Sequence, residues 1–189
     1  MHSIIVRVVG SLLGALTLTS CIPAGLNSPI QCIGVAGVKF PRVVGIDLEG
    51  KEISLPSGLS GRRNLVAIAF KREHQPVVDT WIAEVEPLLA QDPELRLYEV
   101  PTIYEGSILF RLWLNNAMRA GIPDQVARRR TITIYVDREQ FNTALSIPDT
   151  SDVHLLLLNA EGTIAWRSTG PATDEKLAGL SQALVSEKL

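Results

Sequence analysis

An unbroken apolar run in the middle of the chain limits the folds that the chain can adopt. Residues 65–70 read LVAIAF, with no alternation of polar and apolar side chains. A strand with one face in water alternates, whereas such a run is typical of a strand buried on both faces. That burial requires layers on both sides of the sheet. The run therefore predicts that residues 64–71 form the central strand of a sheet.

Strand and helix patterns alternate around this run. The chain is predicted to open with a hairpin of strands 43–48 and 52–55, followed by the central strand and a helix at 76–91. A strand at 94–100, a helix at 107–120, a strand at 131–136 and a helix through 145, opened by Asp137 with Gln140, come next. An antiparallel pair at 153–159 and 163–168 and a helix at 173–188 close the chain. Alternation implies parallel strands with right-handed crossovers, and the final pair adds antiparallel strands. We expect a mixed sheet with helices on both faces.

This order resembles the thioredoxin-like fold, in the version with an extra strand-helix unit that peroxiredoxins and TlpA-type proteins have. The stretch FPRVVGIDLEGKEISLP is similar to their amino-terminal hairpin. The resemblance implies a three-layer α/β sandwich with that hairpin at its start.

The chemistry of the redox members of that fold is missing here. Those members carry reactive cysteines at the amino end of the first helix, which stabilises a thiolate. Here the segment reads LVAIAFKREHQPVVDTW, and no cysteine follows Cys32. They also place a cis-proline just before the final hairpin, where this chain has Val153, and Pro148 comes too early. We therefore predict a scaffold without thiol chemistry and assign no catalytic residue.

The mouth of the first helix, residues 72–75, is the first candidate binding surface. We expect Arg72, Glu73, His74 and Gln75 to face solvent there, with Trp81 packed beneath them. His74 leaves two interpretations open, an acid/base or metal-binding group and a solvated loop histidine. No second ligand for His74 can be predicted, so no metal is assigned.

The amino terminus has the pattern of a targeting segment. Residues 1–21 carry Arg7, then the apolar stretch 8–18 and the box Leu-Thr-Ser-Cys. The stretch is shorter than the ~20 residues that span a bilayer. The box resembles the lipobox of bacterial lipoproteins and implies lipid on Cys21. An ordinary secretory signal is the alternative, in which case a Cys21–Cys32 disulfide is conceivable. We predict a signal peptide at 1–20, a tether at 21–39 and one domain at 40–189.

Composition and residue spacing argue against several classes of function. Eighteen Lys and Arg against 20 Asp and Glu give a net charge of −2, which argues against nucleic acid as a partner. Two cysteines and three histidines do not form a zinc-binding pattern, and no glycine-rich phosphate loop occurs. We predict no cofactor. Cys32 stands alone, without a resolving thiol after it.

Two stretches of the second half resemble a family of assembly proteins. MRAGIPDQVARRRTITIYVDREQF and LLLLNAEGTIAWRSTGPATDEKL are similar to segments of the Atp-ten type assembly factors of mitochondrial ATP synthase and their bacterial relatives. The matching residues are Ile122, Pro123, Arg130, Gly162, Ile164, Trp166, Gly170, Pro171, Ala172 and Thr173. The family has Arg where this chain has Ala165, with Arg167 following instead. The resemblance implies a non-catalytic chaperone for a membrane subunit, and it adds Arg130, Trp166 and Arg167 to the candidate binding residues.

Taken together, these patterns predict a membrane-anchored, non-redox binding or assembly module of the bacterial cell envelope. Its partners would be the membrane, through the lipid, and a protein of unknown identity. Ile22 after Cys21 favours the outer membrane over the inner one. A peroxiredoxin or TlpA-like redox protein and a ligand binder that uses residues 72–74 are the alternatives.

Overall fold

The apolar run forms strand β3 (Arg63–Ala69), which is buried on both faces as predicted. β3 pairs in parallel with β4 (Leu95–Tyr104) and antiparallel with β6 (His154–Leu158). It therefore has hydrogen-bonded neighbours on both sides as well as side-chain layers above and below. The computed structural model describes residues 37–104 and 106–187.

The described strands form one mixed sheet in the order β2-β1-β5-β4-β3-β6-β7. The remaining strands are β1 (Val43–Asp47), β2 (Glu52–Leu55), β5 (Ile132–Val136) and β7 (Ile164–Thr169). β3, β4 and β5 run parallel, while the hairpin β1–β2 and the pair β6–β7 add antiparallel strands at the two edges. The predicted mixed sheet with an amino-terminal hairpin is confirmed.

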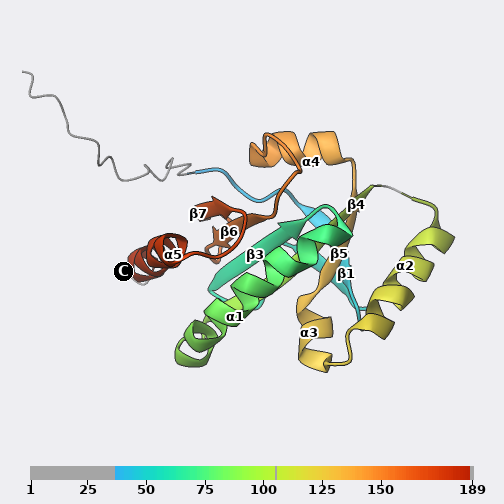
Figure 1. Ribbon diagram of the computed structural model, residues 1–189. Helices are drawn as coiled ribbons and strands as arrows, with labels where there is room; N and C mark the ends of the chain where they lie inside the picture. The colour runs from blue at the N-terminus through green and yellow to red at the C-terminus, as the bar shows by residue number, and fades with distance from the viewer. Residues whose placement is uncertain (1–36, 105, 188–189) are drawn as a thin grey trace, which may run out of the picture. The chain divides into compact units, whose positions relative to one another are not determined.

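Helices cover both faces of this sheet (Figure 1). α1 (Gln75–Gln91) and α5 (Asp174–Ser186) pack on one face, through a core cluster that includes Trp81 and Leu180. α4 (Arg138–Leu145) packs on the other face, through a cluster that includes Phe141. The result is the three-layer sandwich that the sequence predicted.

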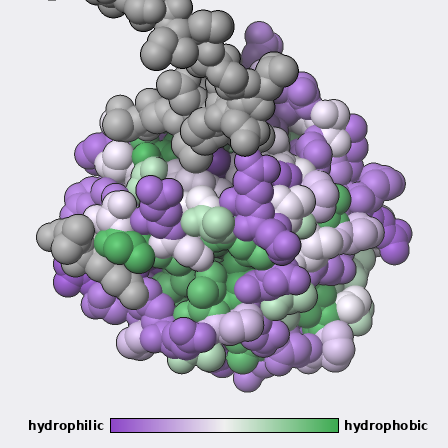
Figure 2. All heavy atoms as spheres, turned by 60° about the vertical axis from the view of Figure 1, so that its left-hand side comes forward, coloured by the Kyte–Doolittle hydropathy of each residue, from purple (hydrophilic) through white to green (hydrophobic). Residues whose placement is uncertain are grey.

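The cluster under α1 and α5 is not fully covered. Five of the apolar residues that pack against it, from these two helices, are only partly buried: Val77, Ile82, Leu88, Leu89 and Leu177. Figure 2 turns the α5 side toward the viewer and shows an apolar area among polar side chains. Partly exposed apolar side chains of this kind are normal for a surface helix packed on a sheet.

Local capping sets where several helices begin. The Asp137 carboxylate accepts hydrogen bonds from the backbone N–H groups of Glu139 and Gln140, which satisfies two amides that the helix itself leaves open. The predicted capping residue of α4 is thus confirmed. Ser107 caps α2 (Ile108–Gly121) and Thr173 caps α5 in the same way.

Three differences from the sequence prediction affect the layout of the fold. β4 runs on to Tyr104 instead of ending at Val100, because β3 and β5 both extend alongside it. Residues 125–130 form a further helix, α3 (Gln125–Arg130), capped by Asp124. The predicted tether reached residue 39, yet Val38 and Lys39 already pair with the start of β7. The predictions on residues 1–36 lie outside the described residues.

Candidate functional site

The turn from β3 into α1 builds the mouth, to which the structure adds Lys71 before the predicted residues 72–75, so that the mouth spans residues 71–75. A single 3-10 turn, η1 (Arg72–His74), links the strand to the helix. Lys71, Arg72, Glu73 and Gln75 are exposed, which confirms the prediction for the last three. The mouth therefore presents cations, an anion and an amide to solvent at the amino end of α1.

His74 is buried, so the prediction that it faces solvent was wrong. Its side chain lies at the N-cap of α1 and the residue is 5% exposed. Nδ1 accepts a hydrogen bond from the backbone N–H of Phe70 at 3.3 Å, and Nε2 lies 3.2 Å from the carbonyl oxygen of Ser151. With Nδ1 as acceptor, Nε2 carries the proton and donates it. Two backbone partners satisfy the ring, so His74 ties the mouth to the 149–152 loop and has no nitrogen left for a metal.

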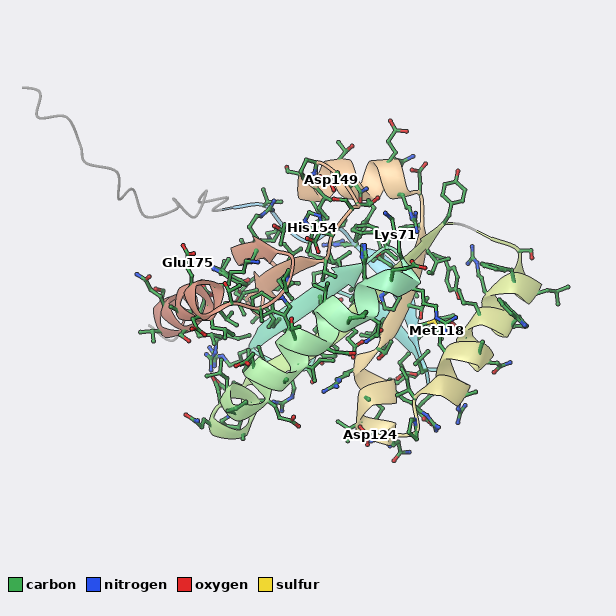
Figure 3. The ribbon with its side chains drawn as sticks, in the orientation of Figure 1. Lys71, Met118, Asp124, Asp149, His154 and Glu175 are labelled. Atoms are coloured by element: carbon green, nitrogen blue, oxygen red, sulfur yellow. The ribbon has the colours of Figure 1, made fainter. Side chains whose placement is uncertain are left out.

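A second histidine, for which the sequence suggested no role, holds the same loop. His154 Nε2 lies 3.0 Å from the carbonyl oxygen of Asp149. The Phe70 ring meets both histidines edge to face, with ring centres 6.5 Å from His74 and 6.0 Å from His154. Figure 3 shows His154 beside Asp149, with Lys71 near them. The loop is thus anchored to the end of β3 through two imidazole rings and one benzene ring.

Burial sets the protonation state of His154. Desolvation lowers the pKa of its imidazole, and the nearby Asp149 opposes that shift. The ring is therefore neutral at neutral pH. The pKa of Asp149 itself is lowered by its hydrogen bonds from Ser151, so this carboxylate keeps its charge at the loop.

A buried carboxylate links the mouth to Arg130. Gln75 Nε2 donates to Glu99 Oε2 at 3.3 Å, and Arg130 Nε lies 3.5 Å from Glu99 Oε1. Burial raises the pKa of Glu99, while the hydrogen bond from Gln75 and the charge of Arg130 oppose that rise. Arg130 is therefore joined to the mouth through Glu99, a residue that sequence reasoning missed. The sequence did indicate the burial of Glu99, because this residue alternates with Leu95 and Leu97 and so points to the same face of β4.

The two β7 candidates differ in their surroundings. Trp166 is 8% exposed and packs edge to face on Trp81, with ring centres 6.0 Å apart. It is a core residue, so its selection as a binding residue was wrong. Arg167 points to the opposite face of β7 and is partly buried. Its Nε and Nη2 atoms are buried without a hydrogen-bond partner, and burial lowers its pKa.

Among the residues that the structure describes, none supplies a thiol to the mouth. Val153, fully buried, precedes β6 where redox members of this fold carry a cis-proline. Within residues 37–104 and 106–187, the cis peptide bond lies elsewhere, at Leu55–Pro56. The same residues contain no cysteine and no group of three side chains that could hold a metal ion. The mouth therefore offers a polar surface on a turn that hydrogen bonds hold to the rest of the domain.

Comparison with known proteins defines the fold but not the family. No family model and no curated protein matches the chain. A thiol:disulfide interchange protein from Bacteroides sp. is 17% identical with a TM-score of 0.53, covering 78% of this chain and 88% of that one. BsSco, a member of the Sco family of cytochrome c oxidase assembly proteins, is 12% identical with a TM-score of 0.56, covering 82% and 96%.

A third similar structure is a putative protein disulfide isomerase from Bacteroides thetaiotaomicron, 12% identical with a TM-score of 0.54, covering 83% of this chain and 92% of that one. These likenesses establish a thioredoxin-like fold, as the order of elements predicted. No comparison supports the Atp-ten family in particular, so that resemblance stays a prediction.

Proposed function

We propose that this thioredoxin-like chain is a membrane-anchored, non-redox module that binds a protein partner through residues 71–75. One observation carries the proposal. The turn where redox relatives hold thiols presents Arg72, Glu73 and Gln75 to solvent instead, above a buried His74. No cysteine follows Cys32 in the sequence, so the folded residues that surround this turn supply no thiol.

The contacts that hold the mouth in place support a binding role. His74 and His154 hold the 149–152 loop, and Gln75 is tied to Glu99. Exposed charges on an anchored turn suit recognition, because little backbone or loop order has to be gained on binding. Charges of both signs match a polar protein surface. BsSco, described as a member of a family of assembly proteins, supports an assembly role on this fold.

The anchor and location belong to the same proposal. Cys21 would carry the lipid and place the domain in the bacterial cell envelope, with Ile22 favouring the outer membrane. In the described part of the chain, no helix is both long and apolar enough to cross a membrane. The ATP synthase as client is the narrower form of the proposal, suggested by the Atp-ten resemblance.

Removing two of the charges of the mouth, those of Arg72 and Glu73, is expected to weaken partner capture about fivefold or more. The variant Arg72→Ala with Glu73→Ala loses exposed side chains only, so its free energy of unfolding should change by about 0.5 kcal/mol or less. The measurement is photo-crosslinking from the mouth in the native membrane, with captured bands quantified against the unmodified chain.

Lys51→Ala with Glu52→Ala is the matched control for this pair. It also removes an exposed cation and its neighbouring anion, but on the hairpin at the far edge of the sheet. Capture should be unchanged in this control. Undiminished capture by the mouth variant would exclude the mouth as the binding surface. A disulfide-exchange activity lost in Cys32→Ser would contradict the non-redox character instead.

The mature protein is expected to begin at an acylated Cys21. The apolar stretch before this residue is too short to span, and it ends in a lipobox-like sequence. Several acyl chains, each methylene contributing ~0.8 kcal/mol, would make a lasting anchor. Mass spectrometry of the protein purified from membranes checks this, and Cys21→Ser is the control that should lose the lipid. An intact Met1 terminus would exclude a cleaved lipoprotein.

A further inference from the structure

Helix α2 exposes apolar side chains that a surface helix ordinarily buries. Leu109 is 78% exposed, Trp113 65% and Leu112 56%, and their i, i+3, i+4 spacing places them on one side of the helix. Phe110, also exposed, has its ring centre 6.1 Å from that of Trp113. A contiguous exposed apolar patch of this kind marks an interaction surface.

The opposite side of α2 faces the sheet through polar groups. Tyr135 on β5 donates its hydroxyl hydrogen to Asn115 Oδ1 at 2.9 Å, and the Arg111 guanidinium lies 4.8 Å from the Tyr135 ring centre. Figure 3 shows Met118 on this inner side of the helix. Polar groups of α2 thus help to hold the helix to the domain, and Leu109, Leu112 and Trp113 point outward. A surface helix usually turns most of its apolar side chains toward the core, whereas α2 leaves these three exposed.

Arginines outnumber acidic residues around helices α2 and α3. Residues 108–130 hold five arginines and one aspartate, in a chain whose net charge is −2, and α2 itself has no acidic residue. Arg119 and Arg128 each lie 3.4 Å from a carboxylate oxygen of Glu49, which links the end of α2 to α3. Arg130 pairs with Glu99, and Arg129 is exposed. Arginines therefore outnumber carboxylates around α2 and α3, although Glu49 and Glu99 pair with three of the five.

We propose that α2 lies on an anionic lipid surface, with Leu109, Leu112 and Trp113 inserted at the boundary between headgroups and acyl chains. A helix with Leu, Phe and Trp on one side and arginines beside them is the type that binds in this interface. Arg119 and Arg129 would contact anionic headgroups, and each basic residue near such a surface strengthens binding several-fold. The proposal goes beyond the lipid anchor and does not depend on it.

Tryptophan fluorescence offers a local test. The chain has three tryptophans, and Trp81 and Trp166 are buried while Trp113 is exposed. A change in emission on adding vesicles therefore reports the surroundings of α2. The full chain with Cys21→Ser, which cannot be acylated at that residue, is mixed with phosphatidylcholine vesicles with or without phosphatidylglycerol. We expect a blue shift with about tenfold higher apparent affinity for the anionic vesicles, reduced by added salt.

Variants separate this helix from other apolar surfaces and keep Trp113 as the reporter. Leu109→Gln with Leu112→Gln should abolish the blue shift. Val44→Gln with Val185→Gln, two exposed valines on β1 and α5, is the matched control and should leave the shift unchanged.

Three results would overturn the proposal. The first is no shift with anionic vesicles, and the second is an equal loss of the shift in both double variants. The third is a blue shift that grows with protein concentration without lipid, which would show a second copy on α2. Cys21 is replaced in every vesicle experiment. A negative vesicle result therefore does not bear on the acylation of Cys21, and a negative acylation result does not bear on vesicle binding by α2.

Discussion

Replacing Trp81 by Ala is expected to lower the free energy of unfolding by about 3–5 kcal/mol, the range for large-to-small changes of buried aromatic residues. The Trp81 side chain is fully buried between α1 and the sheet and packs edge to face on Trp166. Its indole N–H also donates to the carbonyl oxygen of Gly170 at 2.8 Å. The change therefore leaves a cavity, removes an aromatic pair and leaves a buried carbonyl without this donor. Denaturant unfolding followed by circular dichroism measures the loss.

Trp113→Ala is the matched control, because it removes the same side chain from an exposed position on α2. Its effect on stability should stay within about 0.5 kcal/mol. The free energy of unfolding of Trp81→Phe should lie between those of the two alanine variants, since a ring remains but the indole N–H is lost. Equal stability of Trp81→Ala and Trp113→Ala would mean that Trp81 does not pack in the core as described.

Arg63→Ala is expected to lower the free energy of unfolding by a similar amount, about 3–5 kcal/mol, because it breaks a buried ion pair. Arg63 Nη2 donates to both carboxylate oxygens of Asp92, at 2.8 and 2.9 Å. The two side chains are only 6% and 11% exposed. Removing the guanidinium leaves the Asp92 carboxylate buried with less compensation, at the point where α1 ends and β4 begins. Thermal and denaturant unfolding both report the effect.

The neighbouring arginine supplies the control for this prediction. Arg62 is 74% exposed and lies 3.9 Å from a Glu94 oxygen, so Arg62→Ala should cost about 0–1 kcal/mol. A loss in Arg62→Ala as large as that in Arg63→Ala would show that net charge, rather than the buried pair, stabilises this corner of the fold.

Sequence patterns located the mouth but misjudged its chemistry. The end of the apolar run and the start of the following helix placed residues 72–75 correctly, and the exposure of Arg72, Glu73 and Gln75 followed from their polarity. His74 was misjudged because the carbonyl that satisfies its Nε2 belongs to Ser151, 77 residues further along the chain. No local pattern reports a partner at that separation. Trp166 was misjudged for the same reason, since Trp81 lies on a distant helix.

The sequence by itself determined the order of the strands and of the helices other than α3, the burial of β3 on both faces and the cap of α4. These features depend on periodicity and on hydrogen bonds between near neighbours, so the local chain contains the information. Only the tertiary structure decided that Glu99 is buried beside Gln75 and Arg130, that two histidines anchor one loop, and that α2 turns its apolar side outward. Each of these results from groups far apart in sequence, whose desolvation and pairing are set when the layers pack.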